Sequence, residues 1–165
     1  MDNESEKKER RAIRISAMNI LAGREHSIVE LRQKLKRKLS KRDDLLHLDE
    51  LIEVVLEQLI DDNLLDEARF TQCFIRSRIN SGSGPVKIRH ELMQRGISSE
   101  LTNGYLDESY DFWQQYIEAV RNKRFGVQFP EDYKEQSKQS RFLYQRGFSG
   151  EFIRRLFNND KFLKN

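Results

Sequence analysis

The sequence repeats itself internally, and this feature limits the possible folds more than any other. Residues 92–106 read LMQRGISSELTNGYL and residues 143–157 read LYQRGFSGEFIRRLF, an offset of 51 positions. Similarity at a fixed interval is typical of proteins that stack copies of one supersecondary unit. Six of the fifteen aligned positions are identical: Leu92, Gln94, Arg95, Gly96, Ser98 and Glu100 recur as Leu143, Gln145, Arg146, Gly147, Ser149 and Glu151.

A weaker copy lies upstream, where Leu31, Leu35 and Lys38 have the spacing of Ile88, Leu92 and Arg95. Apolar residues in this first copy recur at i, i+3, i+4 and i+7 intervals, which indicates helices with one buried face. Three such stripes begin at Ile13, Ile28 and Leu48. We therefore expect about three helices in each copy.

Capping and turn residues mark the ends of the expected helices. Ser27 and Glu30 form a capping box, in which the hydroxyl and the carboxylate bind backbone N–H groups that lack helical partners. Pro85 suits the first turn of the corresponding helix in the second copy. Gly96 and Gly147 are expected to end the second helices, because glycine adopts the left-handed conformation without steric cost.

The sequence thus predicts an all-α fold of three tandem three-helix, helix-turn-helix-like repeats that form an elongated, curved body. We place a charged N-terminal leader over residues 1–11 and the repeats over residues 12–62, 63–109 and 110–160. The composition agrees, because 37% hydrophobic and 35% charged residues leave little material for one thick core. Two prolines and eight glycines also disfavour a turn-rich β-sandwich or barrel.

Several classes of protein are disfavoured by what the sequence lacks. No apolar run approaches the ~18–20 residues needed to cross a bilayer, so we expect a cytoplasmic protein without a membrane partner. Cys73 is the single cysteine, and we expect it to be a small buried residue rather than a metal or redox group. His26, His47 and His90 are scattered and are expected to be polar surface or capping residues. We find no catalytic, metal or cofactor motif, so we do not expect an enzyme.

Charge is distributed unevenly along the chain. Residues 1–42 have a net charge of +7, whereas residues 43–70 hold ten acidic residues and one basic residue. One interpretation is that neighbouring helix faces pair with each other in water. The other is a surface with separate basic and acidic areas, which would suit a partner of mixed charge, such as a protein on nucleic acid.

The segments around Gly96 and Gly147 have the pattern of a helix-turn-helix, whose second helix would enter the DNA major groove. A bundle that uses the same turn only for packing is the alternative. Acidic residues on a reading helix would meet DNA phosphates of like charge. The expected reading helices have net charges of −4, −3 and 0, and their acidic residues include Asp49, Glu50, Glu53 and Glu57, then Glu100, Asp107 and Glu108, then Glu151 and Asp160.

Basic residues gather instead on and around the second helix of each copy. Such residues can follow a phosphate backbone without reading bases, or bind an acidic protein surface. They are our candidate partner contacts: Arg32, Lys34, Lys36, Arg37, Lys38, Lys87, Arg89, Arg95, Arg121, Lys123, Arg124, Arg141 and Arg146.

Four segments together resemble the signature of the RecX family of bacterial recombination regulators. These are Arg24-Glu25-His26-Ser27-x-x-Glu30-Leu31, Leu65-Asp66-Glu67-Ala68-Arg69-Phe70, Arg76-Ser77-Arg78 and Gly84-Pro85-x-x-Ile88-Arg89-x-Glu91-Leu92-x-x-x-Gly96-Ile97. The resemblance covers roughly residues 12–158. Where many family members have a second Asp after Leu-Asp, this chain has Glu67, which keeps the charge.

The resemblance implies three tandem three-helix repeats, in agreement with the periodicity. It also implies that the protein binds the RecA filament on single-stranded DNA and inhibits strand exchange and ATP hydrolysis. We expect a monomer whose partner is the RecA filament, including the single-stranded DNA within it. The motif residues that serve structure or binding are Arg24, Ser27, Glu30, Asp66, Arg69, Phe70, Arg78, Gly84, Pro85, Leu92 and Gly96. The alternative is a helix-turn-helix DNA-binding protein that acts independently of RecA.

Overall fold

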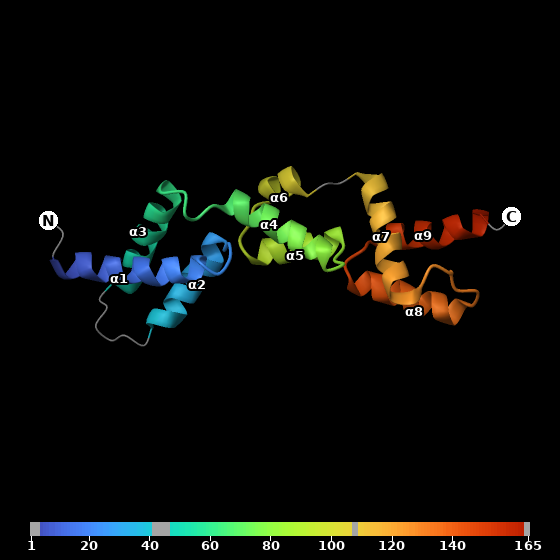
Figure 1. Ribbon diagram of the computed structural model, residues 1–165, viewed down its shortest axis with the longest axis horizontal. Coiled ribbons are helices and arrows are strands. Elements are labelled where there is room, and N and C mark those ends of the chain that lie inside the picture. The colour runs from blue at the N-terminus through green and yellow to red at the C-terminus, as the bar shows by residue number, and fades with distance from the viewer. Residues whose placement is uncertain (1–3, 41–46, 107–108, 164–165) are drawn as a thin grey trace. The chain divides into compact units, whose positions relative to one another are not determined.

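The computed structural model describes residues 4–40, 47–106 and 109–163, with side chains as far as residue 158, and it contains nine α-helices and no strand within these ranges. Asp107 and Glu108, two acidic residues of the expected second reading helix, lie outside the described residues. Asp160, in the expected third reading helix, has a described backbone but no described side chain. The helices are α1 (Glu4–Leu21), α2 (Ile28–Leu39), α3 (Leu48–Asp61), α4 (Glu67–Asn80), α5 (Pro85–Gln94), α6 (Ser99–Tyr105), α7 (Tyr110–Phe125), α8 (Tyr133–Gln145) and α9 (Gly150–Leu163) (Figure 1).

The helices associate in groups along the chain. Helices α1, α2 and α3 all pack against one another, as do α7, α8 and α9, and α5 packs on α6 (Figure 1). The prediction of an all-α fold built from helical repeats is therefore confirmed.

The chain divides into two compact units. The first comprises Met1–Cys73 with Arg95–Ile97, and the second comprises Phe74–Gln94 with Ser98–Asn165. The division falls inside α4, and the turn after α5 belongs to the first unit although its sequence neighbours belong to the second. The repeat boundaries that we placed at residues 63 and 110 remain a prediction.

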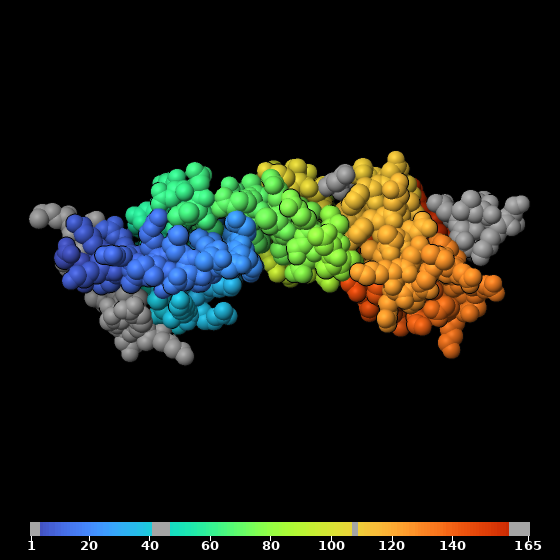
Figure 2. Space-filling view, in the orientation of Figure 1, coloured from blue at the N-terminus to red at the C-terminus, as the bar shows by residue number. Residues whose placement is uncertain are grey.

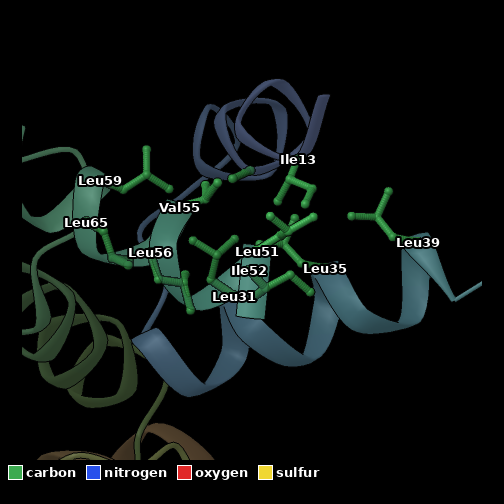
Figure 3. Close-up of a cluster of buried hydrophobic side chains, with 11 residues drawn as sticks. Ile13, Leu31, Leu35, Leu39, Leu51, Ile52, Val55, Leu56, Leu59 and Leu65 are labelled. Carbon is green, nitrogen blue, oxygen red and sulfur yellow. The ribbon is translucent and has the colours of Figure 1, made fainter. Parts of the chain in front are cut away.

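The core of the first unit follows the predicted apolar stripes. Leu31 and Leu35 of α2, Ile52 and Val55 of α3, and Ile13 of α1 are completely buried. Figure 3 shows the side chains of α2 and α3 pointing toward one another, with Ile13 of α1 beside them. Burial of one such side chain contributes roughly 1.5–3 kcal/mol, so these helices are held mainly by their shared apolar faces.

Local capping signals position the helix ends. The Ser27 hydroxyl accepts a hydrogen bond from the Glu30 N–H at 3.1 Å, and Asp66 Oδ1 accepts one from the Arg69 N–H at 3.0 Å. The second half of the predicted capping box differs, because the Glu30 carboxylate accepts hydrogen bonds from Arg24 and Arg95. Arginine guanidinium groups bind a carboxylate more strongly than a neutral backbone N–H does.

Both glycine turns have the predicted backbone conformation. Gly96 has φ of +78° and Gly147 has φ of +93°, and each is the second residue after the end of its helix, α5 or α8. Pro85 is the first residue of α5, where its missing N–H leaves no helical bond unmade.

Residues 4–11 of the expected charged leader are helical and form the start of α1, because their Glu, Lys and Arg residues favour helix and Glu4 and Glu6 complement its N-terminal dipole. Two local expectations were wrong. Cys73 is exposed rather than buried. His26 is buried, with only 1% of its surface exposed.

In the described part of the chain, we find no helix with the length and apolar character needed to cross a membrane.

Candidate partner-binding site

Two of the predicted contact residues on α2 are neutralised by α3. Arg32 binds Glu53 through two hydrogen bonds, from Nε to Oε1 at 2.6 Å and from Nη2 to Oε2 at 2.8 Å. The Lys36 ammonium lies 3.0 Å from Asp49. The hydrogen bond from Arg32 lowers the pKa of Glu53, so this pair stays ionised near neutral pH. Part of the acidic segment 43–70 therefore serves to pair with α2, as the first interpretation of the charge pattern proposed.

Lys34 has a different neighbour. Its Nζ lies 2.7 Å from Nε2 of buried His26, whose Nδ1 lies 2.9 Å from the backbone carbonyl of Arg24. Both contacts are hydrogen bonds if Nδ1 carries the proton and neutral Nε2 accepts from Lys34. Burial lowers the pKa of His26, and the cations Arg24 and Lys34 lower it further. Lys34 is thus held against a neutral imidazole.

Arg37 and Lys38 remain exposed in the last turn of α2, and no ion pair joins either of them to a carboxylate among the described residues. Cations in this position complement the negative end of the helix dipole. Arg37 and Lys38 are therefore the predicted contact residues of α2 that remain accessible to a partner.

The turn after α5 packs on the start of α2, and we call this arrangement the first junction. A Cβ atom added to Gly96 would lie 2.4 Å from Cγ2 of Val29. Arg95 Nε lies 3.1 Å from Glu30 Oε1, and Arg69 Nε lies 2.6 Å from Glu25 Oε1. Two arginines are thus neutralised by two glutamates at this junction.

The turn after α8 packs on the start of α5 in a similar way, and we call this the second junction. The N–H groups of Gly84 and Val86 donate to the carbonyls of Arg146 and Gly147 at 2.7 and 3.1 Å. Lys87 is the third residue of α5, as Glu30 is the third residue of α2. The second junction therefore has a cation where the first has a carboxylate.

Arg146 corresponds to Arg95 in the repeat, and its environment differs accordingly. Its Nη1 donates to the Ser81 carbonyl at 2.9 Å, and its guanidinium lies 5.1 Å from the centre of the Phe142 ring. Carbonyl and ring contacts hold the guanidinium in place without neutralising its charge.

Arg121 must be removed from the candidate contacts, because it is completely buried. Its guanidinium donates to Gln139 Oε1 at 2.9 Å, to the Gly126 carbonyl at 3.0 Å and to the Gln128 carbonyl, and it lies 3.9 Å from the centre of the Phe129 ring. A buried cation needs such partners to offset the loss of water. Arg121 therefore fastens the loop after α7 instead of facing a partner.

The remaining candidates lie in the second unit. Lys87, Lys123, Arg124 and Arg141 are exposed, and no ion pair with a described carboxylate involves them. Arg89 donates to Asn103 Oδ1 at 2.5 Å. The structure thus separates accessible cations from those already engaged inside the protein.

The family-motif residues have structural roles in the described chain. Ser27 and Asp66 cap helices, Pro85 begins α5, and Gly84 and Gly96 permit close packing. Phe70 and Leu92 are buried. The three motif arginines bind carboxylates: Arg24 to Glu30 at 3.1 Å, Arg69 to Glu25 at 2.6 Å and Arg78 to Glu91 at 2.6 Å.

One feature was absent from the sequence prediction. A cavity of about 340 Å³ opens between the end of α4, α7 and α8, and its lining includes Tyr116, Val120 and Phe142 beside three of the predicted cations. No local pattern marks this cavity, because its lining comes from α4, α7 and α8 and from the residues after α4 and α8. Among the described side chains, no group of three or more His, Cys, Asp or Glu residues is placed to hold a metal ion.

Comparison with known proteins places this fold and its motifs in one family. Family models described as RecX, second three-helix domain, and RecX, third three-helix domain, match residues 66–104 and 114–157. The chain is 43% identical over 147 residues to Regulatory protein RecX of Pseudomonas entomophila, covering 89% of this chain and 90% of that protein. It is 40% identical over 143 residues to Regulatory protein RecX of Halorhodospira halophila, covering 87% and 84%.

A solved structure shows the same fold. The crystal structure of RecX from Lactobacillus salivarius superposes with a TM-score of 0.72 at 20% sequence identity, over 93% of this chain and 97% of that one. Since the sequence matches extend over most of both partners and the helical architecture agrees, the chain belongs to the RecX family of regulatory proteins.

Proposed function

We propose that this protein binds the filament that RecA forms on single-stranded DNA and inhibits its recombinase and ATPase activities. In this role it modulates recombination and the SOS response in the cytoplasm as a monomeric regulator that is not an enzyme. Its membership of the RecX family and the resemblance of its motifs support this proposal.

The observation that carries the proposal in this structure is the set of accessible cations beside internally paired acidic residues. Arg37 and Lys38 in the first unit, and Lys123 and Arg124 in the second, are exposed without a described carboxylate partner. A nucleoprotein filament offers both phosphates and acidic side chains to such cations.

The arrangement does not favour the alternative of a helix-turn-helix protein that reads DNA without RecA. Helix α3 would be a reading helix in the first repeat, yet it carries Asp49, Glu50, Glu53 and Glu57. Two of these carboxylates bind Lys36 and Arg32. A reading helix of this charge would be repelled by the phosphates that border a DNA groove.

The direct test is the DNA-dependent ATPase of RecA on single-stranded DNA, measured while this protein is titrated from substoichiometric to stoichiometric amounts. We expect progressive inhibition. An unchanged ATPase rate together with salt-sensitive, sequence-dependent binding to duplex DNA would support the alternative instead.

The contribution of the accessible cations is tested by Arg37→Glu with Lys38→Glu. We expect this variant to need roughly tenfold more protein for half-maximal inhibition, equivalent to about 1.4 kcal/mol. The matched control is Lys7→Glu with Lys8→Glu, which makes the same charge change at exposed positions of α1. Equal inhibition by both variants and the unmodified protein would remove Arg37 and Lys38 from the contact surface without affecting the family assignment.

A further inference from the structure

The cavity between the end of α4, α7 and α8 has an apolar wall and a basic rim. Ala119 and Val120 of α7 line it with Ile79 of α4, while Lys123 and Arg124 lie at the end of α7 beside it. All of these residues belong to the second unit. In Figure 2 the yellow-green segment that contains residues 79–84 adjoins the orange segment of α7 and α8.

The positive charge at this cavity has no counterpart inside the described chain. Lys123 and Arg124 are exposed and form no ion pair with a described carboxylate, and the cavity lining contains no acidic residue. Arg146, which also lines the cavity, is held by the Ser81 carbonyl. The cation is therefore fixed in position and keeps its charge.

In the first junction, the arginine at the position of Arg146 is neutralised by a carboxylate. There, Glu30 binds Arg95, which is the counterpart of Arg146. In the second junction Lys87 occupies the helix position of Glu30, and no described carboxylate forms an ion pair with Arg146. A binding partner with carboxylates could form with Arg146 the kind of ion pair that Glu30 forms with Arg95.

The aromatic residues at the cavity are poorly placed to bind a nucleic-acid base. Stacking of a base requires an open ring face. Tyr116 is stacked on Phe112 with ring centres 5.8 Å apart, and its hydroxyl donates to the Ile79 carbonyl. The Phe142 ring packs perpendicular to the Phe125 ring with centres 5.3 Å apart, and the Arg146 guanidinium lies over the Phe142 ring, 5.1 Å from its centre.

The remaining open wall is aliphatic, formed by side chains such as Ala119 and Val120. A volume of about 340 Å³ accommodates a leucine or phenylalanine side chain, and large apolar side chains in pockets supply much of the energy of protein interfaces. The wall therefore suits an apolar anchor, while the rim suits flanking carboxylates.

We propose that this cavity is a docking site for a peptide segment of a partner protein in which a leucine or phenylalanine is flanked by aspartate or glutamate. The apolar side chain enters between α4 and α7, and the acidic residues pair with Lys123, Arg124 and Arg146. The site extends the proposed function, and its test does not require RecA.

The test uses the full-length protein and a fluorescein-labelled synthetic peptide, GDELFEDG, with binding followed by fluorescence anisotropy. Two further peptides separate the contributions: GNQLFQNG lacks the charges and GDEGGEDG lacks the apolar anchor. We expect each of them to bind at least tenfold more weakly than GDELFEDG, and we expect the affinity of GDELFEDG to fall as salt concentration rises. No detectable binding of GDELFEDG at 1 mM protein, on the order of a −4 kcal/mol interaction, or equal binding of all three peptides, would overturn the proposal.

Two variants locate the site. Lys123→Glu with Arg124→Glu reverses the rim charge, and Ala119→Glu places a carboxylate at the wall from an exposed position that tolerates a helix-forming residue. Each is expected to weaken GDELFEDG binding at least tenfold, whereas Lys7→Glu with Lys8→Glu is expected to leave it unchanged. Far-ultraviolet circular dichroism checks that each variant is folded. Binding that is insensitive to Ala119→Glu would overturn the proposal.

A fluorescein-labelled oligothymidylate of fifteen nucleotides serves as the nucleic-acid probe. We expect labelled GDELFEDG to be displaced by unlabelled peptide but not by an unlabelled form of this oligonucleotide at equal concentration. Displacement of GDELFEDG by the unlabelled oligonucleotide, together with direct binding of the labelled oligonucleotide that is lost in the Lys123→Glu with Arg124→Glu variant, would assign the cavity to nucleic acid and overturn the peptide proposal.

Discussion

The two junctions share a backbone arrangement and differ in charge. In both, a glycine with positive φ follows the second helix of one repeat and packs against the first turn of an earlier second helix. The first junction is closed by Glu30 and Glu25, which bind Arg95 and Arg69. The second has Lys87 in the position of Glu30 and leaves Arg146 on a carbonyl. A glycine thus permits close packing in both places, whereas described carboxylates neutralise the arginines of the first junction and not Arg146 of the second.

The largest expected effect comes from filling the second junction. Gly147→Ala would put Cβ 2.7 Å from the backbone nitrogen and 2.3 Å from Cβ of Lys87, at a residue with φ of +93°. We expect a loss of about 3 kcal/mol or more in the free energy of unfolding, because backbone atoms cannot move aside cheaply. Urea unfolding followed by circular dichroism measures it.

The corresponding change at the first junction sharpens the comparison. Gly96→Ala meets mainly the Val29 side chain, so we expect a smaller loss of about 2 kcal/mol. The control is Gly104→Ala, where an added Cβ meets nothing within 4 Å and φ is not positive; inside a helix we expect a gain of roughly 0.5–1 kcal/mol. Equal losses at Gly147 and Gly96 would show that backbone contact does not distinguish the junctions.

A smaller effect is expected from removing the charge at the first junction. Glu30→Gln keeps the size of the side chain but weakens its hydrogen bonds from Arg24 and Arg95, and we expect a loss of about 1–2 kcal/mol. Burial opposes ionisation of Glu30, yet the hydrogen bond from Arg24 and the charges of Arg24 and Arg95 leave its pKa lowered. The stability it supplies is therefore present above its usual pKa and is lost as pH falls through the lowered value. Unfolding measured at pH 7 and pH 3 should show a smaller difference in the variant.

The smallest effect is expected from the titration of His26. Burial, followed by the neighbouring cations, leaves its pKa below the usual 6.5, so the unfolded chain binds a proton more readily than the folded protein does. Stability should fall as pH drops below about 6.5 and should level off once pH passes the lowered pKa of the folded state. His26→Gln removes this dependence, which thermal unfolding between pH 7.5 and 5 detects. A slope identical to that of the unmodified protein would contradict the assignment of a neutral imidazole.

Local chemistry made much of the fold predictable. The apolar stripes located the helices, Ser27 and Pro85 located two of the helix starts, and Gly96 and Gly147 located the turns, because caps and periodicity act between residues a few positions apart. The candidate contacts were less predictable. Arg121 has the same charge as its neighbours Lys123 and Arg124, yet its side chain points into the protein and binds Gln139, eighteen residues away.

By itself the sequence determined that this chain forms helical repeats with glycine turns, and its motifs pointed to the RecX family. Only the tertiary structure decided which charges are already paired. Arg32 meets Glu53 across 21 residues, and Arg95 meets Glu30 across 65. Such pairs depend on how folded helices bring distant side chains together, which periodicity does not encode. The same long-range packing placed Arg146 against the Ser81 carbonyl, away from every described carboxylate, and formed the cavity beside it.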